Sequence, residues 1–304
     1  MLMSAVDRYL ALRRALGSTL TSAAPLLQSF ARYADARGET HIRRATAQDW
    51  AAIARTPRQR GKRLRLLRGL AGFLHAEDPQ HELPPAPLVC LNPPRPLPYL
   101  FSLDTVQRLV HAAGQLPPRG SLRPRTFQTL FGLLAVTGLR ISEALALRLG
   151  DLTPDGLRIR DTKFHKSRLV PLHATTAAAL AAYLDQRLRV RTAEEHLFVS
   201  LRRTPLCYAT VFRLFRHLCA ALQLPRSPEG RRPRLHDLRH AVAARMLEAC
   251  PQARDAVTPH VLAASTYLGH ASLRSTYWYL QASPQLLGDI ADASAAWMKG
   301  GPAR

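Results

Sequence analysis

The sequence predicts a two-domain, mainly α-helical protein whose second domain carries a small antiparallel sheet. Apolar residues recur at helical spacing through most of the 304 residues, which favours amphipathic helices. A proline-rich stretch at 84–100 interrupts that pattern and predicts a linker between two domains. Two short alternating segments, 157–161 and 168–172, flank a polar turn and predict a β-hairpin.

The first predicted domain, residues 1–83, contains four helices. Ser22 precedes Pro25 and predicts a cap for the second helix, while Thr46 and Asp49 resemble a capping box that would start the third. Two helices are predicted within residues 4–36, a third over 47–55 and a fourth over 59–76.

The predicted helix over 59–76 has a basic side that contains no acidic residue. A side that meets only solvent normally mixes both signs of charge, so this pattern indicates contact with nucleic-acid phosphates. The residues predicted to bind DNA here are Arg58, Arg60, Lys62 and Arg63, and Arg65 and Arg68 lie on the same side.

The second predicted domain, residues 101–304, alternates helices with the hairpin. A basic loop over 225–234 leads to His236 and Arg239, which lie three residues apart at the opening of a helix and therefore project from one face. A Thr-Gly-Leu break at 137–139 separates two helices and leaves Arg140 at the junction. The first predicted helix of this domain follows Ser102. Further helices are predicted over 126–136, 141–149, about 175–190, about 208–222 and 284–298.

The charge balance indicates a polyanionic partner. The chain carries a net charge of +22 and a pI near 11.2, far beyond what solubility requires, and nucleic acid is the leading candidate. A GC-rich genome that supplies arginine codons is the alternative explanation. Codon bias does not explain why only 21 acidic residues accompany 43 basic ones.

Other compositional features favour a cytoplasmic protein. Cys90, Cys207, Cys219 and Cys250 show no metal-binding or disulfide spacing, so reduced and mostly buried thiols are expected. The first residues do not form a signal peptide, and no window approaches the roughly 18 apolar residues of a membrane-spanning helix. We therefore expect neither secretion nor membrane insertion.

Five motifs in series resemble the tyrosine recombinase (phage integrase) family in order and spacing. The resemblance covers about residues 100 to 282, and the N-terminal helices resemble the family's core-binding, SAM-like domain in architecture and charge only. The motifs are Thr-Gly-Leu-Arg-Ile-Ser-Glu at 137–143, Thr-Lys-Phe-His-Lys-Ser-Arg-Leu-Val-Pro-Leu at 162–172, His-Asp-Leu-Arg-His at 236–240, Leu-Gly-His at 268–270 and Tyr279.

The resemblance implies a nucleophile and a phosphate clamp. Tyr279 would attack the phosphodiester and form a covalent 3′-phosphotyrosyl link, with Tyr267 and Tyr277 as competing candidates that more simply pack around Trp278. Arg140 and Arg239 would hold the non-bridging oxygens with paired donors. The alternatives are that Arg140 caps the carbonyls of its own helix and that Arg239 forms a surface ion pair with Asp237 or Glu248.

The resemblance also assigns the proton transfers. His236 would accept the phenolic proton, and His270 would bind a non-bridging oxygen unless it is a buried structural histidine. Lys163 would protonate the leaving 5′-oxygen, because the family's lysine sits just after the first strand of the hairpin. Lys166, deeper in the turn, would touch a flanking phosphate.

The implied activity is site-specific recombination of double-stranded DNA without a cofactor. Asp237 alone cannot supply the carboxylate cluster of a two-metal nuclease, and no Walker motif is present, so neither metal nor ATP is expected. Integration, excision or transposition of a mobile element, or resolution, would proceed in a homotetramer on two DNA sites, formed from monomers or dimers. The alternatives are a type IB topoisomerase-like relaxase and a catalytically silent DNA-binding accessory factor.

Overall fold

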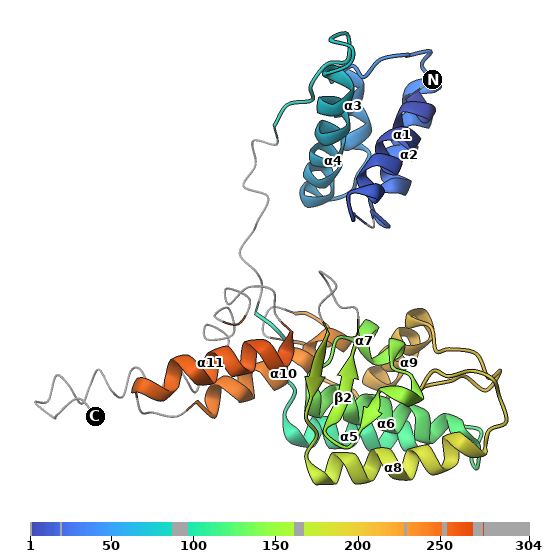
Figure 1. Cartoon of the computed structure of the whole chain (residues 1–304), viewed down its shortest axis with the longest axis vertical. Helices are drawn as coiled ribbons and strands as arrows, with labels where there is room; N and C mark the ends of the chain where they lie inside the picture. Colours follow the sequence, from blue (N-terminus) through green and yellow to red (C-terminus); the bar gives the residue numbers. More distant parts are fainter. Residues whose placement is uncertain are drawn as a thin grey trace, which may run out of the picture. The chain divides into compact units, whose positions relative to one another are not determined.

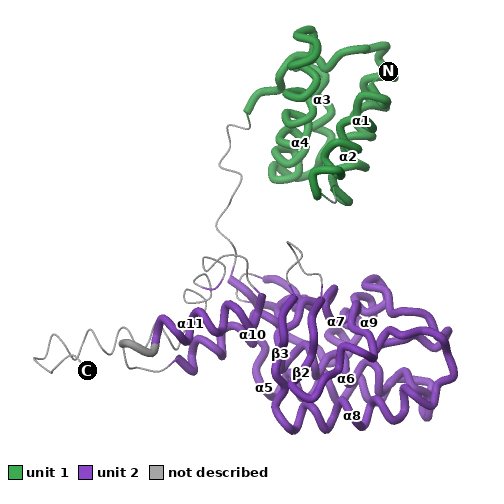
Figure 2. Tube along the Cα trace, viewed as in Figure 1, with its two compact units in different colours: residues 1–96 green, residues 97–304 purple. Residues whose placement is uncertain are grey.

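The chain divides into two compact units, residues 1–96 and 97–304 (Figure 1, Figure 2). The computed structural model describes residues 2–18, 20–86, 97–160, 167–227, 230–250, 254–269 and 276. Helices dominate both units, and a three-stranded antiparallel sheet lies in the second. The predicted fold class is therefore confirmed. The predicted domain limits and the 84–100 linker stay predictions, since most of that linker lies outside the described residues.

The first unit is a four-helix bundle. Its helices bury apolar stripes in one shared core, where the rings of Phe30 and Trp50 meet edge to face with centroids 5.4 Å apart. The fourth helix begins where the Thr56 hydroxyl accepts the backbone N–H of Gln59 at 3.2 Å. The helices are α1 (Leu2–Ala15), α2 (Ala24–Asp35), α3 (Arg44–Ala52) and α4 (Pro57–His75).

Two predicted helix caps in this unit are wrong. Helix α2 starts after Ala23 and has no side-chain cap, so Ser22 does not take that role. Helix α3 starts at Arg44, before Thr46, whose hydroxyl instead donates to the carboxylate of Glu39 at 2.5 Å. The backbone N–H of Arg44 donates to a carboxylate oxygen of Glu82 at 2.7 Å. A residue 38 positions away thus satisfies the first turn of α3, which a local capping pattern does not reveal.

The second unit packs helices around the sheet. Helix α6 lies against α5, α8 and α10, and α10 runs beside α11 (Figure 1). The elements are α5 (Leu103–Gly114), α6 (Leu122–Thr137), α7 (Ile141–Ala146), β1 (Leu152–Thr153), β2 (Gly156–Ile159), β3 (Arg168–Val170), α8 (Ala174–Arg189), α9 (Tyr208–Ala221), α10 (Leu235–Glu248) and α11 (Arg254–Leu268).

The predicted hairpin pairs as expected in its described strands. Strands β2 and β3 are antiparallel, with Leu157 opposite Val170 and Ile159 opposite Arg168. The buried side chains of Leu157, Ile159 and Val170 join the core of the unit, which fixes this register. The two-residue strand β1 was not predicted, because so short a segment shows no alternation.

Three helices of this unit differ from the prediction. Helix α6 begins at Leu122, four residues before the predicted start at 126. Helix α7 ends at Ala146 instead of residue 149, because the backbone N–H of Leu149 leaves the helical pattern and donates to the carbonyl of Glu195 at 2.9 Å. Helix α11 was not predicted, since Pro259 lies inside it and reads as a helix breaker. Packing of Val261 and Leu268 with residues of α10 accounts for the helix despite the proline.

No helix in the described part of the chain has the length and apolar character needed to cross a membrane. The thiols of Cys207, Cys219 and Cys250 are free. Cys219 is buried and Cys250 half-buried, whereas Cys207 is exposed at the start of α9, so the expectation of mostly buried thiols fails there.

Candidate active site

The break between α6 and α7 positions Arg140. Gly138 ends α6 in the left-handed conformation, with φ of 63°, and its N–H donates to the carbonyl of Leu134 at 3.1 Å. Arg140 is then the N-cap residue of α7, and the carboxylate of Glu143 accepts its backbone N–H at 2.9 Å. A β-carbon at position 138 would lie 3.0 Å from the side chain of Leu268. The turn therefore needs a glycine both for its backbone conformation and for its close packing on α11.

Helix α10 brings Arg239 to the same turn. The Arg239 guanidinium is buried and donates to the carbonyl of Gly138 at 2.7 Å and to that of Leu268 at 2.6 Å. Asp237, proposed as a partner in a surface ion pair, instead pairs with Arg234 at 2.8 Å. Arg239 thus joins the end of α6 to the end of α11 from the first turns of α10.

Arg140 reaches the adjoining carbonyl. One of its terminal nitrogens donates to the carbonyl of Gly269 at 2.8 Å, next to the Leu268 carbonyl that Arg239 holds. The Arg140 side chain keeps 31% of its surface exposed and makes no other hydrogen bond to described residues apart from those to Glu143. It does not cap its preceding helix. Two guanidiniums therefore meet at the turn that leads into residue 270, and Arg140 is the one that faces solvent.

His236 opens the same helix and is exposed. Although part of its ring meets solvent, the surrounding protein lowers the pKa of His236 to about 4, first by desolvation and then through the positive charge of Arg239. Its ring stands edge-on to that of His240, with centroids 4.4 Å apart. The imidazole is therefore neutral near pH 7 and has a lone pair with which it can accept a proton.

Glu143 and Arg168 belong to the site, although no role was predicted for either residue. The Glu143 carboxylate is buried and accepts hydrogen bonds from Arg140 at 2.7 Å and from both terminal nitrogens of Arg168 at 2.9 and 3.1 Å. Burial alone would raise the pKa of Glu143, but the bonds from Arg168 and Arg140 outweigh it and hold that pKa at about 2. A signal was present in the quoted motifs, which place an acid three residues after Arg140 and an arginine at the start of β3.

Known proteins resemble the chain over most of its length. Residues 101–285 match the sequence family described as the phage integrase family. The chain belongs to that family. Integrase/recombinase y4rB of Sinorhizobium fredii is 38% identical over 293 residues, which span 93% of each chain. The tyrosine recombinase XerC of Rhodospirillum centenum is 35% identical over 61% of this chain and 50% of its own.

Solved structures share the fold. The XerH recombinase bound to difH after cleavage superposes with a TM-score of 0.67 at 18% identity, covering 90% of this chain and 78% of that one. The Tn1549 transposon integrase bound to transposon-end DNA superposes with a TM-score of 0.66 at 14% identity, covering 97% of this chain and 99% of that one.

Tyrosine recombinases are site-specific enzymes that cleave and rejoin DNA, and this member of the phage integrase family is an enzyme of that class.

Four of the residues predicted for the tyrosine recombinase site lie outside the described residues: Lys163, Lys166, His270 and Tyr279. The predicted terminal helix over 284–298 lies outside them as well. The structure brings Arg140, His236 and Arg239 together, and residue 270 follows directly on the turn that both arginines hold. The catalytic assignments themselves stay predictions.

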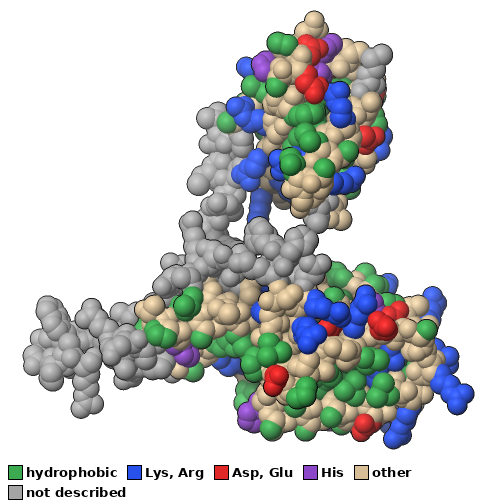
Figure 3. All heavy atoms as spheres, viewed as in Figure 1, with side chains coloured by type: hydrophobic (Ala, Val, Ile, Leu, Met, Phe, Trp, Pro, Cys, Tyr) green, Lys and Arg blue, Asp and Glu red, His purple; other side chains and the backbone are tan. Residues whose placement is uncertain are grey.

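The basic residues predicted on α4 fall into two groups. The guanidinium of Arg60 donates to the carbonyl of Ala54 at 2.9 Å, and that of Arg63 donates to the carbonyl of Trp50 at 2.7 Å and stacks on its ring. Arg58 and Lys62 are exposed, with no hydrogen bond or ion pair to other described residues. Lys and Arg side chains are scattered over the visible face of each unit (Figure 3). Arg58 and Lys62, together with the exposed Arg65, therefore present charge that is open to a phosphate.

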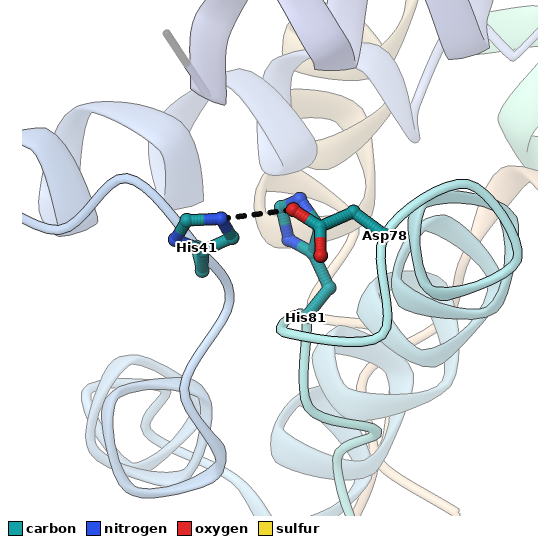
Figure 4. A group of neighbouring side chains, drawn as sticks. All are labelled: His41, Asp78 and His81. Atoms are coloured by element: carbon teal, nitrogen blue, oxygen red, sulfur yellow. Dashed lines mark hydrogen bonds and ion pairs between the residues drawn. The ribbon is translucent and has the colours of Figure 1, made fainter.

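One cluster in the first unit has the composition of a metal site. Possible ligand atoms of His41, Asp78 and His81 lie within 4.8 Å of one another, the only such group among the described residues (Figure 4). His41 Nε2 lies 3.0 Å from the Asp78 carboxylate, while the backbone N–H of Ile42 donates to His81 Nδ1 at 3.1 Å. That bond leaves the proton of neutral His81 on Nε2, which then has no lone pair for a metal. The arrangement instead joins the loop before α3 to the segment after α4.

Proposed function

We propose that this tyrosine recombinase cuts double-stranded DNA at specific sites through attack by Tyr279, and rejoins it from a 3′-phosphotyrosyl intermediate. The observation that carries the proposal is the meeting of Arg140 and Arg239 at one turn, beside a neutral His236. A phosphodiester gains negative charge on its non-bridging oxygens as the nucleophile attacks, and guanidiniums fixed in advance stabilise that charge. The DNA-bound structures of the XerH recombinase and the Tn1549 integrase support DNA as the partner.

The proposed roles follow from the chemistry of each group. His236 accepts the phenolic proton of Tyr279, since its imidazole is neutral and open to solvent. Lys163 protonates the leaving 5′-oxygen, His270 binds a non-bridging oxygen, and Lys166 contacts a flanking phosphate. The covalent link conserves the energy of the broken bond, so rejoining needs no cofactor.

The experiment that tests the proposal is trapping on a nicked suicide substrate. The full-length protein should form a covalent adduct with DNA, and Tyr279→Phe should abolish the adduct while leaving DNA affinity almost unchanged. Tyr277→Phe is the matched control and should still form it. An adduct that survives in Tyr279→Phe and disappears in Tyr277→Phe would assign the nucleophile to the other tyrosine.

We further propose assembly of four protomers on two DNA sites, with the 284–298 segment docking on a neighbouring protomer. The tetramer in the solved structure of lambda integrase on a Holliday junction supports this form of assembly. Deleting residues 284–304 should leave cleavage intact and abolish strand exchange, as scored on two labelled sites. Full-rate strand exchange by the truncated protein would mean that docking of this segment on a neighbouring protomer is wrong.

A further inference from the structure

We propose that Arg168 is a positioning residue that offsets the charge of Glu143 and thereby leaves Arg140 cationic toward the scissile phosphate. This inference rests on the proposed function and adds a positioning residue to it. Arg168 lies at the start of β3, 25 residues after Glu143 in the chain, and the fold alone brings them together.

The contacts between Arg168 and Glu143 have the geometry of a two-pronged ion pair. Terminal nitrogens of Arg168 lie 3.1 and 2.9 Å from the two oxygens of Glu143, and the side chains are only 11% and 7% exposed. Such paired, charge-assisted bonds are the stronger kind of hydrogen bond. The Glu143 oxygens also accept the backbone N–H and one guanidinium nitrogen of Arg140. Each oxygen therefore serves both arginines.

The sharing of Glu143 between two arginines sets the net charge of the three side chains. Glu143 is ionised at every working pH, because its pKa lies at about 2. Paired with Arg140 alone, the carboxylate would cancel the positive charge that a phosphate needs. With Arg168 present, two guanidiniums face one carboxylate and the group keeps a net positive charge. Most of the exposed part of that group belongs to Arg140, whose side chain is 31% exposed against 11% for Arg168.

Arg168 also touches the turn before residue 270. Its Nε donates to the carbonyl of Tyr267 at 2.9 Å. A β-carbon added to Gly269 would lie only 2.5 Å from a terminal nitrogen of the Arg168 guanidinium. A purely structural role, in which Arg168 only supports the turn, would therefore also slow the enzyme when the residue is replaced. The test must separate the two roles by charge.

The experiment measures single-turnover cleavage of a nicked suicide substrate at saturating DNA, with DNA affinity measured separately. Arg168→Met should slow cleavage by about 10- to 100-fold, less than the loss of a direct oxyanion donor, and change the Kd only a few-fold. Adding Glu143→Gln to Arg168→Met removes the uncompensated negative charge and should recover a large part of the rate. Arg160→Met, which breaks the 2.7 Å ion pair with Asp151 elsewhere on the hairpin, is the control and should cleave normally.

The outcomes separate the two proposals. If the unaltered protein forms no adduct, the proposed function fails. If it forms one but the double variant is as slow as Arg168→Met, or Arg168→Met cleaves at the full rate, only the charge role of Arg168 is overturned. Arg168→Lys retains the positive charge and should cleave within about tenfold of the unaltered rate, so it keeps the test decisive if Arg168→Met does not fold. A loss of more than about tenfold in the lysine variant would also overturn the charge role.

Discussion

Replacing Gly269 with alanine should destabilise the second unit more than the same change at another glycine of similar backbone conformation. Gly269 has φ of 66°, which costs an alanine about 1–2 kcal/mol. The new methyl group would also lie 2.5 Å from a terminal nitrogen of Arg168, which must therefore move. That guanidinium is held by Glu143 and by the Tyr267 carbonyl, and losing one such charge-assisted bond costs about 1.5–3 kcal/mol.

The expected total is therefore about 2.5–5 kcal/mol for Gly269→Ala, from the sum of these two costs. Gly120→Ala is the matched control, because Gly120 has φ of 80° and no atom within 4 Å of the added β-carbon, so only the backbone cost of about 1–2 kcal/mol applies. Urea titration followed by hydrogen exchange of α10 peptides reports the second unit selectively. Equal losses of stability in the two variants would refute the reasoning that Arg168 is firmly held.

Three further predictions concern acid stability, helix capping and DNA affinity. Glu143 has an unfolded pKa near 4.5 and a folded pKa of about 2, so its contribution of about 3 kcal/mol is present above pH 4.5 and is lost as pH falls toward 2. Urea titrations at pH 6 and pH 3 should show a smaller loss of unfolding free energy between these two pH values in Glu143→Gln than in the unaltered protein. An equal loss in both proteins would mean that other carboxylates cause it. Ser102→Ala should cost about 1 kcal/mol, because the Ser102 hydroxyl caps α5, and thermal melts that show no loss of stability would contradict this cap. If Arg58 and Lys62 contact phosphates, replacing both with glutamine should flatten the slope of log K against log salt by about 1.8, or 0.9 for each contact, in fluorescence-anisotropy titrations; an unchanged slope would place the contacts elsewhere.

The sequence predicted best what local patterns determine. Apolar periodicity located the helices of the first unit, and the Gly138 break predicted both the end of α6 and the place of Arg140. The spacing of His236 and Arg239 correctly predicted that they share the opening of α10. These features depend on residues within a few positions of one another, which is why a single sequence carries them.

Long-range contacts account for what the sequence could not predict. The cap that Glu82 gives to α3, and the helix that continues through Pro259, both depend on residues distant in the chain or on packing. The link between Arg168 and Glu143 has the same origin. Both residues lie in the quoted motifs, but nothing in the sequence shows that they pair, and only the position of β3 beside α7 and α11 makes them partners.

The burial of Arg239 has a consequence for how variants of this enzyme are to be interpreted. Its guanidinium holds the carbonyls of Gly138 and Leu268 before any DNA arrives, so the chain meets the ordering cost of this side chain when it folds. A substitution there removes a charge from the site and at the same time releases two segments of the scaffold. A screen for loss of recombination and a screen for loss of solubility would then select the same position, and neither alone could say which property failed first.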